Sequence, residues 1–154
     1  IPMISQYAEK VATVHGAHNP EVLEIRAILE GVAAELSEHL LKEENILFPY
    51  IERLILMENN GAVLLNAGVM TISAPIQVMV HEHESAGEAF REISKLSNGY
   101  HPPDYACNTY RVLYAKLQEF EQDLHLHVHL ENNILFPKAI AVENKLKSIR
   151  ANSA

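Results

Sequence analysis

The eleven residues HLLKEENILFP, which begin at His39, return in altered form as HVHLENNILFP, which begins at His127. Overlaying the two copies matches His39 with His127 and Glu43 with Glu131. Residues four apart on a helix lie one above the other, so each copy directs an imidazole and a carboxylate the same way. The Ile, Leu and Phe beside each pair indicate a buried face, where a carboxylate needs a partner. The repeat therefore predicts two matching His–Glu pairs, for which a metal ion is the natural partner.

The rest of the chain shows apolar residues every three or four positions, a spacing typical of helices. Pro49 lies inside one of these patterns and should kink or divide the helix there. No stretch alternates with the period of two that is typical of a strand. Because the connections are short, neighbouring helices should be antiparallel, which predicts an all-α, up-down-up-down four-helix bundle. The expected helices are residues 1–14, 20–57, 73–96 and 103–142, with a connecting loop at 58–68 and a frayed polar tail after 142.

The composition excludes several classes of protein. The chain has 154 residues, which is about one domain, and a formal net charge of -8, which would repel a nucleic-acid backbone. No apolar run approaches the roughly 20 residues needed to cross a membrane. The first residues do not resemble a signal peptide, and the single cysteine, Cys107, cannot form an internal disulfide. We therefore expect a soluble cytoplasmic protein in which Cys107 is a small buried apolar residue.

Two more histidines are candidates for the same site. Judged by distance from the nearest turns, His83 and His15 should lie at about the same depth as the two repeated pairs. Four imidazoles and two carboxylates at one level would make a dinuclear site that suits iron, manganese or zinc. A ferritin-type site would use more carboxylates and Glu-x-x-His motifs. The predicted ligands are His15, His39, Glu43, His83, His127 and Glu131.

Other polar residues have plainer interpretations. A single His-x-x-x-Glu is usually a surface pair of little consequence. Glu35 shares the face of His39, and Glu82 adjoins His83, so each either lines the pocket behind the ligands or is solvated. The remaining histidines are expected on the surface, beside the ligands or in loops: His18, His81, His101, His125 and His129.

Four stretches, HLLKEENILFP, HEHESAGE, HPPDYACNTY and HLENNILFPKA, resemble the hemerythrin-like domain of the iron-sulfur cluster repair (RIC) family over nearly the whole chain. The resemblance implies a four-helix bundle with two non-haem iron ions (Fe2+/Fe3+), bridged by carboxylates and an oxo or hydroxo group. It implies that Glu43 and Glu131 bridge the irons and that the four histidines are terminal ligands. It also implies acidic residues near the irons at Glu35 and Glu82.

The chain departs from the family pattern at its beginning. The family usually supplies one further histidine from a position upstream of Ile1. Many members also begin with a small domain that bears a cysteine pair. Residues 1–154 are therefore expected to be a single hemerythrin-like domain without the start of its first helix and without that upstream domain.

The resemblance implies a cytoplasmic protein that repairs iron-sulfur clusters damaged by nitrosative or oxidative stress. Iron donation and NO reduction are both open, so whether the protein is an enzyme is open too. Expected partners are NO, O2 or H2O2, damaged iron-sulfur proteins and a second copy of the chain, but neither nucleic acid nor membrane. The alternatives are a hemerythrin-like O2 or NO binder or sensor without turnover, and a metal-free helical bundle.

Overall fold

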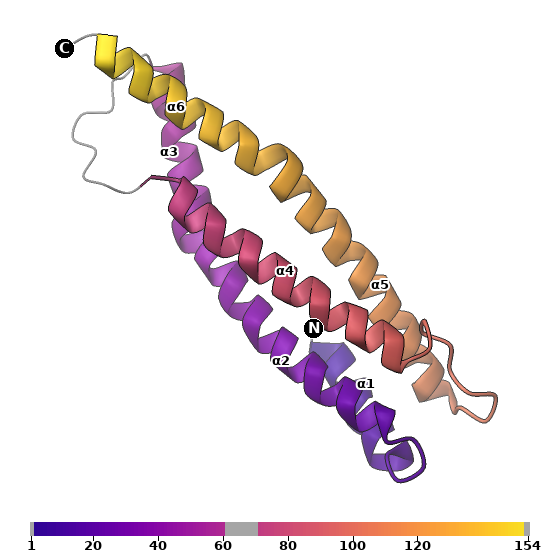
Figure 1. Cartoon of the computed structure of the whole chain (residues 1–154). Coiled ribbons are helices and arrows are strands. Elements are labelled where there is room, and N and C mark those ends of the chain that lie inside the picture. The colour runs from indigo at the N-terminus through magenta and orange to yellow at the C-terminus, as the bar shows by residue number, and fades with distance from the viewer. Residues whose placement is uncertain (1, 61–70, 153–154) are drawn as a thin grey trace. The chain divides into compact units, whose positions relative to one another are not determined.

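The computed structural model describes residues 2–60 and 71–152, and these residues form helices without any strand (Figure 1). The predicted all-α class is therefore confirmed. Two of the four helical rods each contain a short π-helical segment. The elements are α1 Pro2–His15; α2 Glu21–Lys42, η1 Glu43–Leu47 and α3 Phe48–Asn59; α4 Ser73–Leu96; and α5 Asn108–Leu130, η2 Glu131–Leu135 and α6 Phe136–Asn152.

The chain divides into two compact units. The first unit comprises residues 1–37 and 83–126, and the second comprises residues 38–82 and 127–154. The predicted loop at residues 58–68 falls mostly outside the described residues, although Glu58 and Asn59 belong to α3. No described helix is long and apolar enough to cross a membrane.

The first unit packs four helical segments, from α1, α2, α4 and α5, around one apolar core. Ile25, Phe90 and Leu117 are among its fully buried side chains. The turn from α1 to α2 requires a glycine, because a Cβ on Gly16 would lie 2.5 Å from the carbonyl oxygen of Ala12. The short turn makes these two helices antiparallel neighbours, as the sequence predicts.

The connection between α4 and α5 is longer than the sequence predicts. Helix α5 begins at Asn108 rather than near Pro103. The residues before it are irregular because two successive prolines supply no backbone N–H, and Arg111 instead donates side-chain hydrogen bonds to the carbonyl oxygens of Asp104 and Ala106. The chain therefore holds a fixed loop at this end of the first unit.

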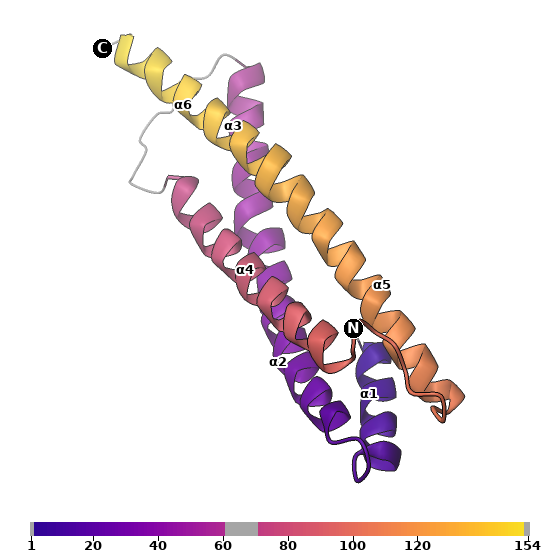
Figure 2. The ribbon, with the colours of Figure 1, turned by 45° about the vertical axis from the view of Figure 1, so that its right-hand side comes forward.

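The second unit has its own apolar core, which includes Leu47, Ile51, Ile72 and Phe136. Helices α3 and α6 lie side by side in both views of the ribbon (Figure 2). The predicted frayed tail after residue 142 is wrong, because α6 continues to Asn152.

A buried carboxylate explains why α6 continues. Glu143 is 2% exposed, and it accepts hydrogen bonds from the Tyr50 hydroxyl and the Ile72 backbone N–H, each at 2.9 Å. Lys147 adds an ion pair at 2.6 Å. One turn further on, Leu146 is buried in the core. The polar tail therefore contains the residues that fix it to the rest of the unit.

The two π-helical segments coincide with the repeated phrase. In η1 the backbone N–H of Phe48 bonds to the carbonyl oxygen of Glu43, and in η2 Phe136 bonds to Glu131 in the same way. The sequence predicts that Pro49 kinks or divides its helix. The structure places the interruption in the five residues before Phe48, as a π-helix, with Pro49 in the first turn of α3. Single-turn π segments are frequent at functional sites.

Candidate metal centre

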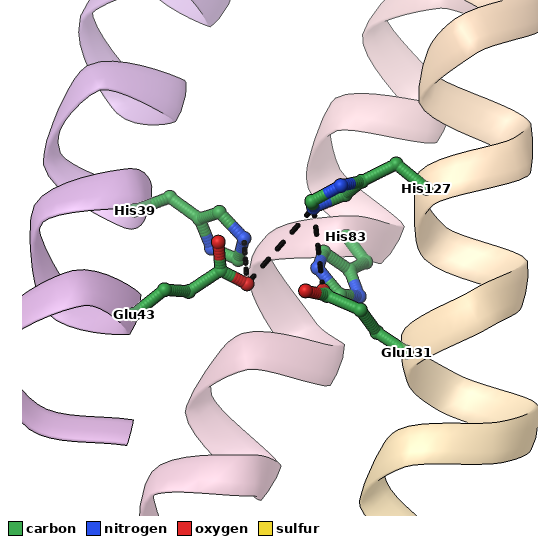
Figure 3. A group of neighbouring side chains, drawn as sticks. All are labelled: His39, Glu43, His83, His127 and Glu131. Carbon is green, nitrogen blue, oxygen red and sulfur yellow. Dashed lines mark ion pairs between the residues drawn. The ribbon is translucent and has the colours of Figure 1, made fainter. Parts of the chain in front are cut away.

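Four of the predicted ligands meet within the second unit. His39 lies near the end of α2 and His127 near the end of α5, while Glu43 and Glu131 are the first residues of η1 and η2 (Figure 3). The Nε2 atom of His39 lies 3.2 Å from Glu43 Oε1, and that of His127 lies 3.3 Å from Glu131 Oε2. His127 Nε2 is also 4.0 Å from Glu43 Oε1. The two phrases thus direct their polar side chains at one another.

His83 is the fifth member of the group. It directly follows Glu82, the last α4 residue of the second unit. Each of the five side chains offers one ligand atom, and these atoms all lie within 4.8 Å of one another. His39, Glu43, His83 and Glu131 are buried, with 1, 1, 3 and 5% exposure, and only the His127 side chain is 39% exposed. A buried set of donors this close is arranged to share a cation.

The buried carboxylate of Glu43 lacks the positive partner that a metal ion would provide. Glu43 Oε1 is buried and accepts no hydrogen bond from the described residues, although two imidazole nitrogens are near it. An uncompensated buried carboxylate oxygen is unfavourable, and a metal ion supplies the missing positive charge. Three imidazoles with two carboxylates and no thiolate form a donor set that suits non-haem iron.

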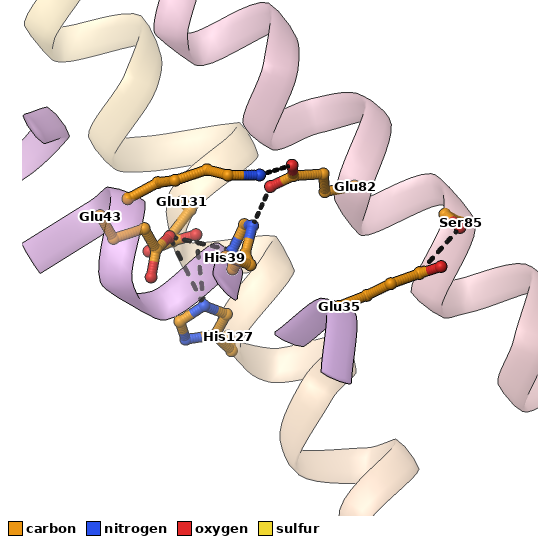
Figure 4. Close-up of polar contacts among 8 residues, drawn as sticks. Glu35, His39, Glu43, Glu82, Ser85, His127 and Glu131 are labelled. Atoms are coloured by element: carbon orange, nitrogen blue, oxygen red, sulfur yellow. Dashed lines mark hydrogen bonds and ion pairs between the residues drawn. The ribbon is translucent and has the colours of Figure 1, made fainter. Parts of the chain in front are cut away.

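His39 is fixed from its other side as well. Its Nδ1 lies 2.8 Å from Glu82 Oε2 (Figure 4). The ammonium group of Lys42 pairs with Glu82 Oε1. Burial lowers the pKa of His39, but the nearby carboxylates of Glu43 and Glu82 outweigh it and raise the pKa above the ordinary value. Burial likewise raises the pKa of Glu82, but Lys42 and His39 lower it overall. A carboxylate on Nδ1 orients the ring so that Nε2 faces the cluster.

Glu35 behaves differently from Glu82. It is exposed, and it accepts a hydrogen bond from the Ser85 hydroxyl at 3.3 Å (Figure 4). It is not part of the group of five. Of the two acidic residues expected beside the ligands, Glu82 contacts His39, whereas a role for Glu35 stays a prediction.

His15 is not brought to this group. Its Nε2 lies 3.2 Å from Cys107 Sγ, and its ring packs against Tyr110 with the centroids 5.2 Å apart. His15 is the last residue of α1, directly before the turn, whereas His39 is 18 residues after the first residue of α2. At 1.5 Å per residue that is roughly 27 Å from the turn. The group of five therefore does not include His15, and its place among the ligands stays a prediction.

The remaining predictions concern burial. Cys107 is exposed, so the prediction that it is a buried apolar residue is wrong. It lies in the irregular loop before α5, where no helix face turns it toward the core. Five histidines are exposed, as expected for surface or loop positions: His18, His81, His101, His125 and His129.

Lys42 and Glu143 are important residues that the sequence pattern does not indicate. The partner of Lys42 is 40 residues away, and Tyr50 is 93 residues from Glu143, so no local spacing reveals either contact. The lone charge of Glu143 among the apolar positions of α6 is a weak signal that this residue is buried.

A family profile described as "Hemerythrin HHE cation binding domain" matches residues 1–139. The chain is 41% identical over 140 residues to a "Probable iron-sulfur cluster repair protein" of Haemophilus influenzae, covering 91% of this chain and 57% of that protein. It is 43% identical over 145 residues to "Iron-sulfur cluster repair protein YtfE" of Pectobacterium atrosepticum, covering 93% of this chain and 59% of that protein. The protein of the same name from Yersinia pseudotuberculosis is 38% identical over 143 residues, with the same coverage of 93 and 59%.

The chain thus spans less than three fifths of the length of these curated relatives. The matched family binds cations, and the five clustered side chains are consistent with a non-haem di-iron site. On its sequence match and its helical structure, the chain belongs to the hemerythrin HHE cation-binding domain family.

Proposed function

We propose that this protein helps to repair iron-sulfur clusters damaged by nitrosative or oxidative stress, by iron donation, by NO reduction, or by both. The observation that carries the proposal is the buried group of three imidazoles and two carboxylates, whose ligand atoms all lie within 4.8 Å of one another. The names of the curated relatives support the choice of repair over other di-iron functions. Because the chain spans only part of those relatives, the activity and its protein substrates are proposals for this chain.

Each side chain has a role in holding the irons. His39, His83 and His127 would be terminal ligands, and Glu43 and Glu131 would bridge the two ions. Iron held by these residues would supply one-electron chemistry between its ferrous and ferric states. Glu82 and Lys42 orient His39. His127 is the most exposed of the five, so small molecules such as NO, O2 or H2O2 would reach the irons past this side chain.

A second candidate is reversible binding or sensing of O2 or NO without turnover. It is favoured by the matched family profile, whose description names cation binding and no reaction. Anaerobic addition of NO to the iron-loaded protein separates the two candidates. Formation of N2O, or transfer of iron to an apo iron-sulfur protein, supports repair, whereas a reversible spectral change with neither product supports sensing.

The ligand assignment has its own test. Glu43→Leu should reduce the bound iron from about two ions per chain by at least half and remove the absorption of the bridged pair. The matched control is Glu44→Leu, which alters the next residue, an exposed carboxylate, and should leave iron and spectrum unchanged. Full iron content and an intact spectrum in Glu43→Leu would show that the bridge is assigned wrongly. A wild-type protein purified without iron would favour the metal-free bundle.

The proposal also covers domain, location and assembly. The family match to residues 1–139 extends over both units, which supports one domain. A single cysteine suits the reducing cytoplasm.

The second unit exposes large apolar side chains such as Leu41, Leu56 and Leu130, at 58, 59 and 48%, which a second copy of the chain would cover. Light scattering coupled to gel filtration should then give twice the mass of one chain.

A further inference from the structure

The first unit contains a cavity of about 540 Å³ that includes none of the five clustered ligands. The start of α2, the turn after α4 and the start of α5 line it. One wall is the HPPDYACNTY stretch, to which the proposed repair function assigns no role. The volume is within the range of small-molecule sites. The cavity is therefore a candidate for a second, separate binding site.

The charge of the cavity is negative. Glu21 and Asp104 line it, and no lysine or arginine is among its described lining residues. Glu21 Oε1 accepts a hydrogen bond from Asn19 Nδ2 at 2.9 Å and a longer one from the Tyr110 hydroxyl at 3.4 Å. Its Oε2 accepts none from the described residues, and no basic side chain pairs with it. The neighbouring Arg111 donates its hydrogen bonds to carbonyl oxygens of the loop backbone instead.

The wall also contains more acceptors than donors. Asn19 is 7% exposed, and its amide nitrogen donates both to Glu21 and to the Tyr105 hydroxyl, at 2.9 and 2.8 Å. The amide cannot be turned around, because its oxygen would then face the Glu21 carboxylate. Asn19 Oδ1 is consequently buried without a hydrogen bond. The surroundings of Glu21 thus favour an incoming group that donates hydrogen bonds.

Aromatic rings complete the lining. The hydroxyls of Tyr110 and Tyr114 are 3.2 Å apart, and the rings meet edge to face with centroids 4.9 Å apart. Burial raises the pKa of both phenols, so they are neutral at physiological pH. Both of these rings are buried, with 0 and 2% exposure, whereas the ring of Tyr105 in the same lining is 66% exposed. An exposed phenol ring near a carboxylate attracts an organic cation to its face.

The rim of the cavity is held in an unusual backbone conformation. Asn98 and Tyr100 have φ of 52° and 64°, values that residues other than glycine rarely adopt. The Ser97 hydroxyl accepts a hydrogen bond from the Tyr100 backbone N–H at 3.0 Å and stabilises this turn. Strain retained by specific contacts is more frequent at binding sites than elsewhere.

We propose that this cavity binds an organic cation with a primary ammonium group, either a free alkylamine or a lysine side chain of a partner protein. Glu21 Oε2 accepts the ammonium hydrogen bonds, and the exposed ring of Tyr105 packs against the alkyl chain. A bare metal ion suits the cavity less well, because the clustered ligands are the one group among the described residues that could hold such an ion.

Isothermal titration calorimetry on the full chain, purified with its metals at pH 7 and low ionic strength, tests the proposal. The probes are 1,5-diaminopentane, Nα-acetyl-lysine amide and its neutral counterpart Nα-acetyl-norleucine amide. Saturable binding of the diamine alone identifies a free amine, and binding of the lysine amide identifies a side chain. No saturable binding of either cation overturns the proposal, and so does equal binding of the norleucine amide.

Two substitutions locate the site. Glu21→Gln removes the charge but keeps the shape, and should weaken binding of the probe by about tenfold or more. Glu24→Gln, an exposed carboxylate one turn away that does not line the cavity, is the matched control and should bind like wild type. If Glu21→Gln does not fold by circular dichroism, Asp104→Asn on the exposed rim should weaken binding about threefold. Equal affinity in the folded cavity variants and the control overturns the proposal. Iron content and NO chemistry are measured separately, so failure here leaves the repair proposal untouched.

Discussion

His39 touches a carboxylate with each ring nitrogen, and this double contact explains more of the site than any single ligand does. Glu43 lies at Nε2 and Glu82 at Nδ1. The position of Glu43 follows from helical spacing, so the sequence predicts it. The contact with Glu82 joins two helices. From the sequence, Glu82 could equally have been a solvated residue. Lys42, which neutralises Glu82, has no signal in the sequence at all.

The first prediction concerns Glu82. Glu82→Gln should weaken iron binding about tenfold, because partners of the outer ring nitrogen typically affect metal affinity by 10- to 100-fold. Competition with a coloured chelator measures the affinity. Glu88→Gln, a change at an exposed residue of the same helix, should have no effect. Equal iron release from both variants would mean that Glu82 does not orient His39.

At the scale of the element, the π-helical segments can be recognised in the sequence by the spacing of the residues around them, which the usual three-and-four helical pattern does not reveal. Along each of the two rods, the inward-facing positions follow one another at intervals of four. The series are His39, Glu43, Leu47 and Ile51 in one rod, and His127, Glu131, Leu135 and Ala139 in the other. Four residues of an α-helix exceed a full turn by about 40°, so three such intervals would drift by about 120°. A wider π turn removes the drift and keeps both ligands and core residues on one face.

Inserting one alanine directly after Asn45 tests this interpretation. Asn45 is an exposed residue of η1, whose wide turn already accommodates the extra residue, so one more should rotate the following helix by about 100° and turn Leu47 and Ile51 out of the core. We expect a loss of several kcal/mol in unfolding free energy, as for other large core disruptions. Asn45→Ala is the control, since it removes only the side-chain hydrogen bond to the Leu41 carbonyl oxygen. A chemical denaturation midpoint like that of the control would argue against the phasing role.

Glu143 gives a pH-dependent prediction for α6. Burial raises its pKa, but Lys147, the Ile72 N–H and the Tyr50 hydroxyl outweigh burial and hold the pKa below the ordinary value for a glutamate. A depressed folded-state pKa contributes stability above the unfolded value, and this contribution is lost as pH falls through the folded value. Glu143→Gln should therefore reduce the unfolding free energy by about 1–3 kcal/mol at pH 7, and by less below about pH 4.5. Urea titrations at several pH values measure this difference.

The control for that experiment is Glu58→Gln. Glu58 pairs with Lys145 at 2.7 Å, but both side chains are accessible to solvent. A pair of this kind contributes about 0–1 kcal/mol. A pH-independent difference in Glu143→Gln, or a loss no larger than in the control, would contradict the proposed role of the buried carboxylate.

At the scale of the whole molecule, the ligands and the core of the second unit should be energetically linked. A metal that binds only the folded state at 100 times its dissociation constant adds about 2.7 kcal/mol. Removing iron with a chelator should therefore lower the melting temperature by about 5–10 °C for a chain of this size. Hydrogen exchange should show the largest loss of protection in residues 38–59 and 127–146. Equal melting curves with and without iron would indicate that the cluster does not hold the ions.

The helical class and the two His–Glu pairs follow from sequence because both depend on short, regular spacing. The depth of His15 cannot be derived in this way and stays a prediction, because depth in a bundle depends on where the turns fall, and an error of a few residues moves a side chain by several ångströms. The prediction that Cys107 is buried is wrong, because the prolines before it delay the start of α5. Long-range contacts such as Tyr50 with Glu143 require the fold itself.

The contact between the exposed Cys107 and His15 has a practical consequence. Cys107 is the one cysteine in the sequence, so a maleimide fluorophore or a nitroxide would attach at a single site without any engineered mutation. Its neighbours Asp104 and Tyr105 line the cavity of the first unit. The emission of such a label would report amine binding there directly, while the iron absorption would independently report the state of the histidine and glutamate cluster.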